Sequence, residues 1–333
     1  MQDQENIRSL DILTILQEAS GQYVSGEHLS QHLGISRAAV WKRISALKKE
    51  GFIIEAVTRK GYRLNSSENP YGKPAILNKL VTHTFGKELK FFTQVDSTNS
   101  VLKQLAAEGA LEGTIVVAES QTGGRGRLGR SWVSASGTGI WLSLLLKPKL
   151  HPGEVQTLTL AASVAVCRAL EHLNIPGLGI KWPNDVLIGR KKVCGILTEL
   201  SAEAERIAWV ILGIGLNVNH LEQDFSDEIV SIATSLRLNM EDRKPLDRSM
   251  LAAGIINALE EVYEDYLKDG ASRMIDEWKS RSVTLGKKVR LISHDGSQVV
   301  LVQDITQDGK LVVKQEDGRS LEVLSGEISL REL

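Results

Sequence analysis

The chain of 333 residues contains only two cysteines, Cys167 and Cys194, and neither stands in a C-x-x-C pair or beside a histidine cluster. This scarcity argues against a disulfide framework or a zinc site, and favours two reduced thiols in a cytoplasmic protein. The chain also lacks an apolar run near the roughly 18 residues that span a bilayer. Residues 1–10 are polar, without the apolar core of a signal peptide. We therefore expect no membrane segment.

An excess of charge of either sign is missing too. The formal net charge is −1, so the chain as a whole is not a polycation and any nucleic-acid binding must come from a local patch. Residues 36–63 supply such a patch: eight Lys and Arg against two Glu give a local charge of +6. Cations gathered in this way can neutralise phosphates.

The same region has a helix-turn-helix pattern, within a first domain expected over residues 1–65. Ser25 and Ser36 stand where helix N-caps are expected, with Gly34 at the turn between the helices. The alternating apolar residues around the Arg59-Lys60-Gly61 turn resemble the wing of a winged helix. We predict a DNA-binding domain; the alternative is a protein-interaction domain with a solvated basic face. The predicted DNA contacts, at the start of the second helix and on the wing, are Ser36, Arg37, Ala38, Ala39, Lys42, Arg43, Arg59 and Lys60.

The residue pattern changes twice in the rest of the chain. Residues 66–74 contain two prolines and a polar cluster and are predicted to be a linker. Residues 75–280 mix helical patterns with β runs. From about residue 283 short alternating strands are separated by Asp-Gly pairs at 295–296, 308–309 and 317–318, which are typical of hairpin turns.

Residues 121–130, QTGGRGRLGR, form the most unusual segment. Its glycines let the backbone approach a ligand closely, and its arginine forks suit phosphate or carboxylate. We predict an irregular, flexible loop that orders around an anion; an RNA-binding Gly-Arg segment and a merely solvated loop are the alternatives. It is not a P-loop, because G-x-x-x-x-G-K-[ST] is absent.

Three further motifs are ambiguous by themselves. The Asp96-Ser97-Thr98-Asn99 turn can cap a helix or bind a small polar ligand. In residues 181–185, KWPND, the oxygens of Asn184 and Asp185 suit a hard divalent cation or an amine, but a capped hairpin with a buried Trp explains them as well. The Gly213-x-Gly215-x-Asn217 pattern permits close approach of a nucleotide and lacks the Rossmann fingerprint. No motif of a nucleophilic Ser or Cys is present.

Together and in this order, the four motifs resemble those of the biotin protein ligases, over residues 75–280, with no departure at a motif position. With the preceding helix-turn-helix, the chain resembles the bifunctional subgroup, which combines a ligase with a biotin operon repressor. The resemblance implies an α+β fold. Its parts would be an N-terminal winged helix-turn-helix, a central mixed sheet with helices like that of class II aminoacyl-tRNA synthetases, and a C-terminal SH3-like β-barrel at residues 283–333.

The resemblance also implies a reaction in which ATP and biotin, with Mg²⁺, form biotinyl-5′-AMP, and biotin then passes to a lysine of a carrier protein such as an acetyl-CoA carboxylase subunit. No protein ligand to the metal is predicted. Ser97, Thr98 and Gln121 would hold the ureido ring of biotin, and Trp132 would cover the adenine. The implied binding residues are Ser97, Thr98, Asn99, Gln121, Gly124, Arg125, Gly126, Arg127, Trp132, Lys192, Gly195, Gly213, Gly215 and Asn217. The implied catalytic residues are Arg125, Arg127, Lys192 and Asp185.

The chemistry is consistent with these residue types. The carboxylate of biotin is ionised at neutral pH, so its attack on the α-phosphate needs cations to neutralise two anions rather than a base. Asp185 is predicted to receive the acceptor ammonium. The adenylate would favour a homodimer that binds a palindromic operator. The rival interpretations are a transcription factor that only senses biotin, a ligase for lipoate, and a monofunctional ligase.

Overall fold

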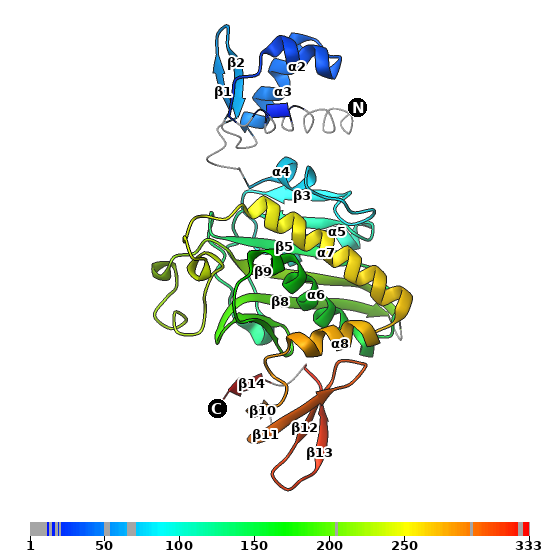
Figure 1. Cartoon of the computed structure of the whole chain (residues 1–333). Helices are drawn as coiled ribbons and strands as arrows, with labels where there is room; N and C mark the ends of the chain where they lie inside the picture. The colour runs from blue at the N-terminus through cyan, green and yellow to red at the C-terminus, as the bar shows by residue number, and fades with distance from the viewer. Residues whose placement is uncertain are drawn as a thin grey trace. The chain divides into compact units, whose positions relative to one another are not determined.

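The computed structural model describes residues 12, 15, 16, 19, 21–49, 54–64, 71–203, 206–293, 296–325 and 329–332 (Figure 1). They fall into two compact units, one within residues 1–80 and 247–253, the other within residues 81–246 and 254–333. Residues 1–10, residues 66–70 of the expected linker and Asp295 of the first expected Asp-Gly turn lie outside the described residues. Across the part of the chain that is described, no helix has the length and apolar character needed to cross a bilayer.

The first unit contains the expected helix-turn-helix. The backbone N–H of His28 donates to Ser25 Oγ at 3.0 Å, and that of Ala39 donates to Ser36 Oγ at 3.2 Å, so both serines cap helices as predicted. Gly34 ends the first helix in the left-handed conformation, with φ of 61°. The elements of this unit are α2 (Gly26–Leu33), α3 (Arg37–Lys49), the antiparallel strands β1 (Ile54–Val57) and β2 (Gly61–Leu64), and α4 (Lys73–Leu77).

The β1–β2 hairpin is tied to the segment before α2. Val24 and Tyr62 exchange two backbone hydrogen bonds, each of 2.8 Å. Gly61 has φ of 104°, and a Cβ at this position would lie 2.1 Å from the carbonyl oxygen of Val24, so only glycine fits there. The hairpin thus takes the place expected for a wing. Helix α4 begins at Lys73, inside the stretch expected to be a linker; Pro74 suits its first turn.

The second unit is built on a seven-stranded mixed sheet with the order β3-β4-β5-β9-β8-β7-β6. Only β3 and β4 run parallel; every other neighbouring pair is antiparallel. Its strands are β3 (Leu89–Phe92), β4 (Ile115–Ala118), β5 (Gly139–Leu146), β6 (Leu178–Lys181), β7 (Asp185–Ile188), β8 (Lys191–Glu203) and β9 (Arg206–Asn217).

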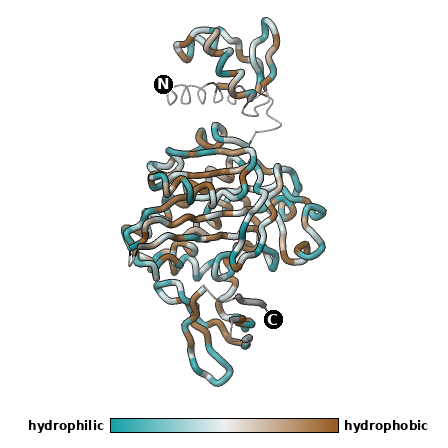
Figure 2. The backbone as a smooth tube through the Cα atoms, turned by 180° about the vertical axis from the view of Figure 1, so that it is seen from behind, coloured by the Kyte–Doolittle hydropathy of each residue, from teal (hydrophilic) through white to brown (hydrophobic). Residues whose placement is uncertain are grey.

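Helices cover both faces of this sheet. Every residue of β5 is buried, and because side chains alternate along a strand, neighbours face opposite layers. Leu145 packs with α5 (Thr98–Ala107), whereas Leu144 packs with α6 (Val155–Leu170) and α7 (Arg248–Asp269). The hydrophobic colouring along the central strands in Figure 2 agrees with burial on both faces. Helix α8 (Ser272–Arg281) joins α6 through Arg168 and Glu277, whose charged atoms are 2.6 Å apart.

A five-stranded antiparallel sheet ends the chain, with the order β13-β12-β11-β10-β14. The expected turns are present at Gly309 and Gly318, with φ of 84° and 88°. The indole N–H of Trp182 donates to the carbonyl oxygen of Gly309 at 3.2 Å, so this small sheet is fastened to the large one. Its strands are β10 (Lys288–Ser293), β11 (Gly296–Ile305), β12 (Leu311–Lys314), β13 (Ser320–Val323) and β14 (Ser329–Glu332). The expected α+β class, with a large mixed sheet and a separate C-terminal sheet, is confirmed.

Candidate functional site

A pocket of about 990 Å³ opens on the large sheet, a size typical of small-molecule sites. It brings together the four sequence motifs, which are up to 120 positions apart in the chain (Ser97 to Asn217). Every binding or catalytic residue predicted from the sequence lines the pocket except Gly124. The residues that do so are Ser97, Thr98, Asn99, Gln121, Arg125, Gly126, Arg127, Trp132, Asp185, Lys192, Gly195, Gly213, Gly215 and Asn217.

One end of the pocket is a buried polar network at the start of α5. Ser97 is the N-cap residue, but its side chain makes no capping hydrogen bond, so capping does not account for its hydroxyl. The backbone N–H and the hydroxyl of Thr98 both donate to Gln121 Oε1, at 2.8 and 3.1 Å. Gln121 Nε2 donates to Ser134 Oγ at 2.8 Å. These contacts fix the orientation of the Gln121 amide.

Asn99 belongs to a second branch of this network, which the sequence did not reveal. Its Oδ1 accepts from Ser143 Oγ at 2.6 Å, and its Nδ2 donates to Glu199 Oε2 at 2.7 Å. Glu199 in turn pairs with Lys103 at 2.6 Å. A Cβ at Gly213 would lie 2.3 Å from Asn99 Oδ1, so this glycine makes room for a protein side chain. Ser143 and Glu199 lie in strands without a recognisable motif.

The arginine-rich segment contains no α-helix or β-strand, as expected of an irregular loop, but its backbone pairs with itself. We name residues 121–134 the arginine hairpin, because isolated bridges pair Gln121 with Ser134 and Arg125 with Ser131. A short 3₁₀ turn at Arg127–Gly129 reverses the chain. Gly124 lies inside this hairpin, where a Cβ would be 2.3 Å from the carbonyl oxygen of Trp132. Its glycine therefore serves the close pairing of the two arms.

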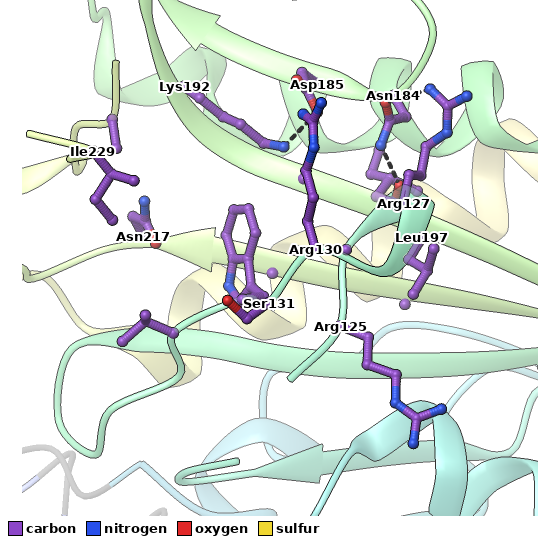
Figure 3. A pocket seen from close by; sticks show the side chains of 18 of the residues that line it. Arg125, Arg127, Arg130, Ser131, Asn184, Asp185, Lys192, Leu197, Asn217 and Ile229 are labelled. Atoms are coloured by element: carbon purple, nitrogen blue, oxygen red, sulfur yellow. Dashed lines mark hydrogen bonds and ion pairs between the residues drawn. The ribbon is translucent and has the colours of Figure 1, made fainter. Parts of the chain in front are cut away.

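Two arginines of the hairpin reach the KWPND segment. Figure 3 shows Arg127 and Arg130 extending toward Asn184 and Asp185, whereas Arg125 points the other way. Arg127 donates to Asn184 Oδ1 at 3.3 Å and to the carbonyl oxygen of Ser325 in the C-terminal segment. Burial lowers the pKa of the Arg127 guanidinium; nearby Asp185 opposes this effect and Arg130 adds to it.

Lys192 supplies the next cation of the pocket. Its ammonium lies 2.6 Å from Asp185 Oδ1 (Figure 3) and 5.0 Å from the centre of the Trp132 ring. The Trp132 indole lies over two of the predicted glycines: a Cβ at Gly195 or Gly215 would come within 2.9 or 2.7 Å of it. Gly215, predicted to border a nucleotide, and Gly195, predicted to bind biotin or its adenylate, first provide space for the tryptophan.

Residues 220–233, which the sequence did not indicate, line another side of the pocket; we call this segment the lip. Two backbone hydrogen bonds hold it against β8: Lys192 N–H donates to Ile232 O at 2.8 Å, and Thr234 N–H donates to Lys192 O at 2.9 Å. His220, which is 3% exposed, stacks on Phe225; burial lowers the pKa of His220 to about 4. No motif marks this segment. Its lining residues are His220, Asp224, Phe225, Ser226, Glu228, Ile229, Ile232 and Ala233.

Six of the eight predicted DNA contacts are exposed on the first unit, and two are half-buried. Ala39 and Arg43 are half-buried, and the Nη1 atom of Arg43 is buried within the unit. Trp41, absent from the prediction, is exposed on the same helix. The exposed members of the predicted set are Ser36, Arg37, Ala38, Lys42, Arg59 and Lys60.

The wing carries a cluster of its own. The guanidinium of Arg63 lies 4.7 Å from the centre of the Tyr23 ring, and the ammonium of Lys60 lies 5.7 Å from it. Glu55 pairs with Arg63. Hydrogen bonds from Tyr23 and then Arg63 lower the pKa of the Glu55 carboxyl. The cations near the wing are thereby held in position.

Comparison with known proteins identifies three successive parts of the chain. Residues 8–63 match an HTH domain, residues 91–217 the biotin/lipoate A/B protein ligase family, and residues 284–331 the biotin protein ligase C-terminal domain. The bifunctional ligase/repressor BirA of Bacillus subtilis is 39% identical over 92% of this chain and 94% of its own length.

This chain belongs to the bifunctional biotin ligase/repressor family. The BirA of Escherichia coli is 30% identical over 98% of both chains. The structure of a biotin protein ligase from Aquifex aeolicus in complex with biotin and ATP superposes with a TM-score of 0.64, at 33% identity over 74% of this chain and 100% of that chain. As a member of this family, the protein is an ATP-dependent biotin ligase and a DNA-binding repressor.

Proposed function

We propose that the protein joins biotin to ATP as biotinyl-5′-AMP, transfers biotin to a lysine of a biotin-accepting carrier protein, and represses transcription when the adenylate is bound. One observation carries the proposal: a single pocket holds a buried network of hydroxyls and amides at one end and the cations Arg127 and Lys192 at the other. A ligand with an uncharged polar head and an anionic tail fits this division.

The polar end favours the ureido ring of biotin. Ser97, Thr98 and Gln121 offer hydroxyl and amide groups that can pair with a cyclic urea, and these groups are buried or half-buried. The dithiolane ring of lipoate has no N–H or carbonyl to match them. Burying it there would add no hydrogen bond to the network, whereas a cyclic urea offers both donors and an acceptor to it. Lipoate is therefore the weaker substrate candidate.

The cationic end is assigned to the first half-reaction. The biotin carboxylate and the α-phosphate of ATP are both anions, and their approach is opposed by mutual repulsion. Arg127 and Lys192 neutralise that repulsion, and Arg125 and Gly126 complete the cover from the arginine hairpin. Gly195, Gly213, Gly215, Asn217 and Trp132 border the nucleotide, with Trp132 against the adenine. Enclosure of the mixed anhydride protects it from water.

Mg²⁺ is expected to arrive on ATP. The described residues contain no cluster of three or more His, Cys, Asp or Glu side chains that could hold a metal ion, and the carboxylates lining the pocket are Asp185, Asp224 and Glu228. Since Mg²⁺ commonly takes most of its ligands from phosphates and water, one of these carboxylates would suffice as a protein ligand.

Asp185 is assigned to the second half-reaction. The acceptor lysine must attack as a free amine, although its unperturbed pKa of about 10.4 keeps it protonated. Asp185 carries a carboxylate oxygen at the pocket, paired with Lys192. When the α-phosphate engages Lys192, Asp185 becomes available to orient the incoming ammonium and receive its proton.

The regulatory half of the proposal joins the two functions. The adenylate favours a homodimer, and the dimer presents two copies of the helix-turn-helix to a palindromic operator. We further propose that the large sheet is of the class II aminoacyl-tRNA synthetase type, that residues 283–333 form an SH3-like barrel, and that the protein works in the cytoplasm, where ATP, carrier and operator meet. Residues 1–65, 66–74 and 75–280 would be the DNA-binding domain, linker and catalytic domain.

Pyrophosphate release with ATP, Mg²⁺ and a panel of acids tests the ligase. Biotin should support release and transfer to a biotin carboxyl carrier domain, whereas lipoate and octanoate should not. Arg127→Ala should slow release about a hundredfold, in the range for one lost transition-state contact. The matched control is Arg319→Ala, which changes an exposed arginine in the turn between β12 and β13. Equal release with all three acids would contradict the proposed substrate.

A gel-shift titration tests the repressor. The DNA of the control region of a biotin synthesis or transport gene should bind more tightly when biotin and ATP are both present. Coupling of about 1–3 kcal/mol is usual and corresponds to a gain of about 5- to 150-fold. Equal affinity with and without biotin and ATP would refute the co-repressor role and leave the ligase untouched.

A further inference from the structure

The solvent-facing side of α3 carries a large aromatic residue. The side chain of Trp41 is 64% exposed, whereas Trp141, Trp182 and Trp278 are at most 1% exposed. Val40, Ile44 and Leu47 form the buried side of the same helix, so Trp41 is not needed for the core of this unit. A single exposed apolar side chain is ordinary, but its place on this helix deserves an explanation.

The neighbours of Trp41 point to a polyanionic partner. Arg37, Ala38 and Lys48 are exposed at spacings of four, three and seven residues from Trp41, and therefore share one helix face with it. Ser36 caps the start of this helix. The face thus combines cations with an indole and a methyl group, and it belongs to the second helix of a helix-turn-helix, the element that enters the major groove.

We propose that Trp41 contacts the 5-methyl group of a thymine in the operator and contributes to sequence recognition. The proposal rests on the repressor function above. Cations on this face hold phosphates, which position the helix without selecting a sequence. Thymine methyls are the apolar groups that the major groove displays, and apolar side chains recognise them. Trp41 is the largest apolar group that the described part of α3 exposes, so it is the residue best suited to that contact.

The test uses duplexes selected from a randomised library by the full-length protein in the presence of biotin and ATP. Each thymine of a selected duplex is replaced singly by deoxyuridine, which removes only the methyl group. With the unchanged protein, replacement of one particular thymine in each half-site should lower the affinity for the duplex about fourfold, the value for one buried methyl-sized group. With Trp41→Ala the overall affinity should fall about tenfold, and the uridine effect at that thymine should vanish.

Matched variants separate recognition from folding. Alanine is the strongest helix former, so Trp41→Ala should keep the helical circular dichroism and the biotin transfer rate. Trp41→Phe should retain part of the uridine effect. Lys60→Ala, a change on the wing, should lower the slope of log affinity against log salt by about two, one for each copy in the dimer, and keep the uridine effect intact.

Several outcomes would overturn the proposal. It fails if Trp41→Ala binds as tightly as the unchanged protein, or if the variant binds weakly yet keeps the same sensitivity to every uridine. A change in dimerisation without a change in DNA affinity would assign Trp41 to a contact between two copies of the chain. If no duplex is enriched by the unchanged protein, the repressor function itself fails, a result distinct from these.

Discussion

The ammonium of Lys192 and the carboxylate of Asp185 meet at 2.6 Å at the pocket. They come from adjacent strands, β8 and β7, whose register shifts between Val186 and Leu187. The two side chains are 30% and 24% exposed, so solvent screens the pair only partly. A phosphate that binds Lys192 competes with Asp185 for the same cation. We infer that occupation by the nucleotide and release of the carboxylate are linked.

Asp185→Asn tests this linkage. The amide keeps the size of the side chain but cannot accept the proton of the acceptor lysine, so transfer from preformed biotinyl-5′-AMP should slow about a hundredfold, the lower range for a lost acid–base group. Pyrophosphate release should be affected much less, because Lys192 remains. Single-turnover transfer to a carrier domain measures the effect. Transfer at the unchanged rate would remove Asp185 from the mechanism.

Gly215→Ala tests the place of Trp132. The added Cβ would lie 2.7 Å from the indole nitrogen, which forces the ring from its position. The KM for ATP should rise about tenfold or more, while the KM for biotin changes little. Gly254→Ala is the control, since its Cβ would have 3.9 Å to the nearest atom, on Ala169. In the background Trp132→Ala, the Gly215 change should have almost no further effect; an undiminished effect would locate the damage elsewhere.

Glu260→Gln tests a long-range anchor of the second unit. The carboxylate of Glu260 is 5% exposed and accepts the backbone N–H groups of His83, Thr84 and Phe85 at 2.5, 2.6 and 2.7 Å. One oxygen becomes an NH₂ group in the variant and can no longer accept. The free energy of unfolding in urea should fall by about 2–3 kcal/mol.

The adjacent Glu261 provides the control for that experiment. Its side chain is 66% exposed and pairs with Arg168 at the surface. Glu261→Gln should change the free energy of unfolding by no more than about 1 kcal/mol. Equal losses from the two substitutions would show that the contacts of Glu260 do not stabilise the fold.

His220 gives the stability a defined pH dependence. Burial lowers its pKa to about 4, whereas an exposed imidazole has a pKa of about 6.5. Between these values the unfolded chain binds the proton more readily, so this contribution to stability is present above pH 6.5 and is lost as the pH falls toward 4. The loss should approach about 3 kcal/mol, since one pKa unit is about 1.4 kcal/mol. Urea unfolding of the unchanged protein and His220→Gln across this range should converge at acid pH; parallel curves would contradict the assignment.

The features fixed by near neighbours in the chain were predictable from the residues alone. The caps at Ser25 and Ser36 and the glycine turns at Gly34 and Gly309 depend on hydrogen bonds and backbone angles within a few positions. The motif residues of the pocket were also found, because their types and order carry the resemblance to the biotin ligases. The contacts that those residues make in the folded chain could not be predicted in the same way. Gly213 and Gly215, expected to face a nucleotide, lie against Asn99 and Trp132.

Contacts between distant segments depended on the pairing of strands and the packing of helices. The segment around Ile232 reaches the pocket because its backbone pairs with Lys192, and Glu199 reaches Asn99 because its side chain lies on the face of the sheet against which α5 packs. Arg127 meets Ser325 across 198 positions of sequence. Such contacts leave no periodic trace in the amino-acid order, since the partners are chosen by the geometry of the folded sheet and not by residues nearby in the chain.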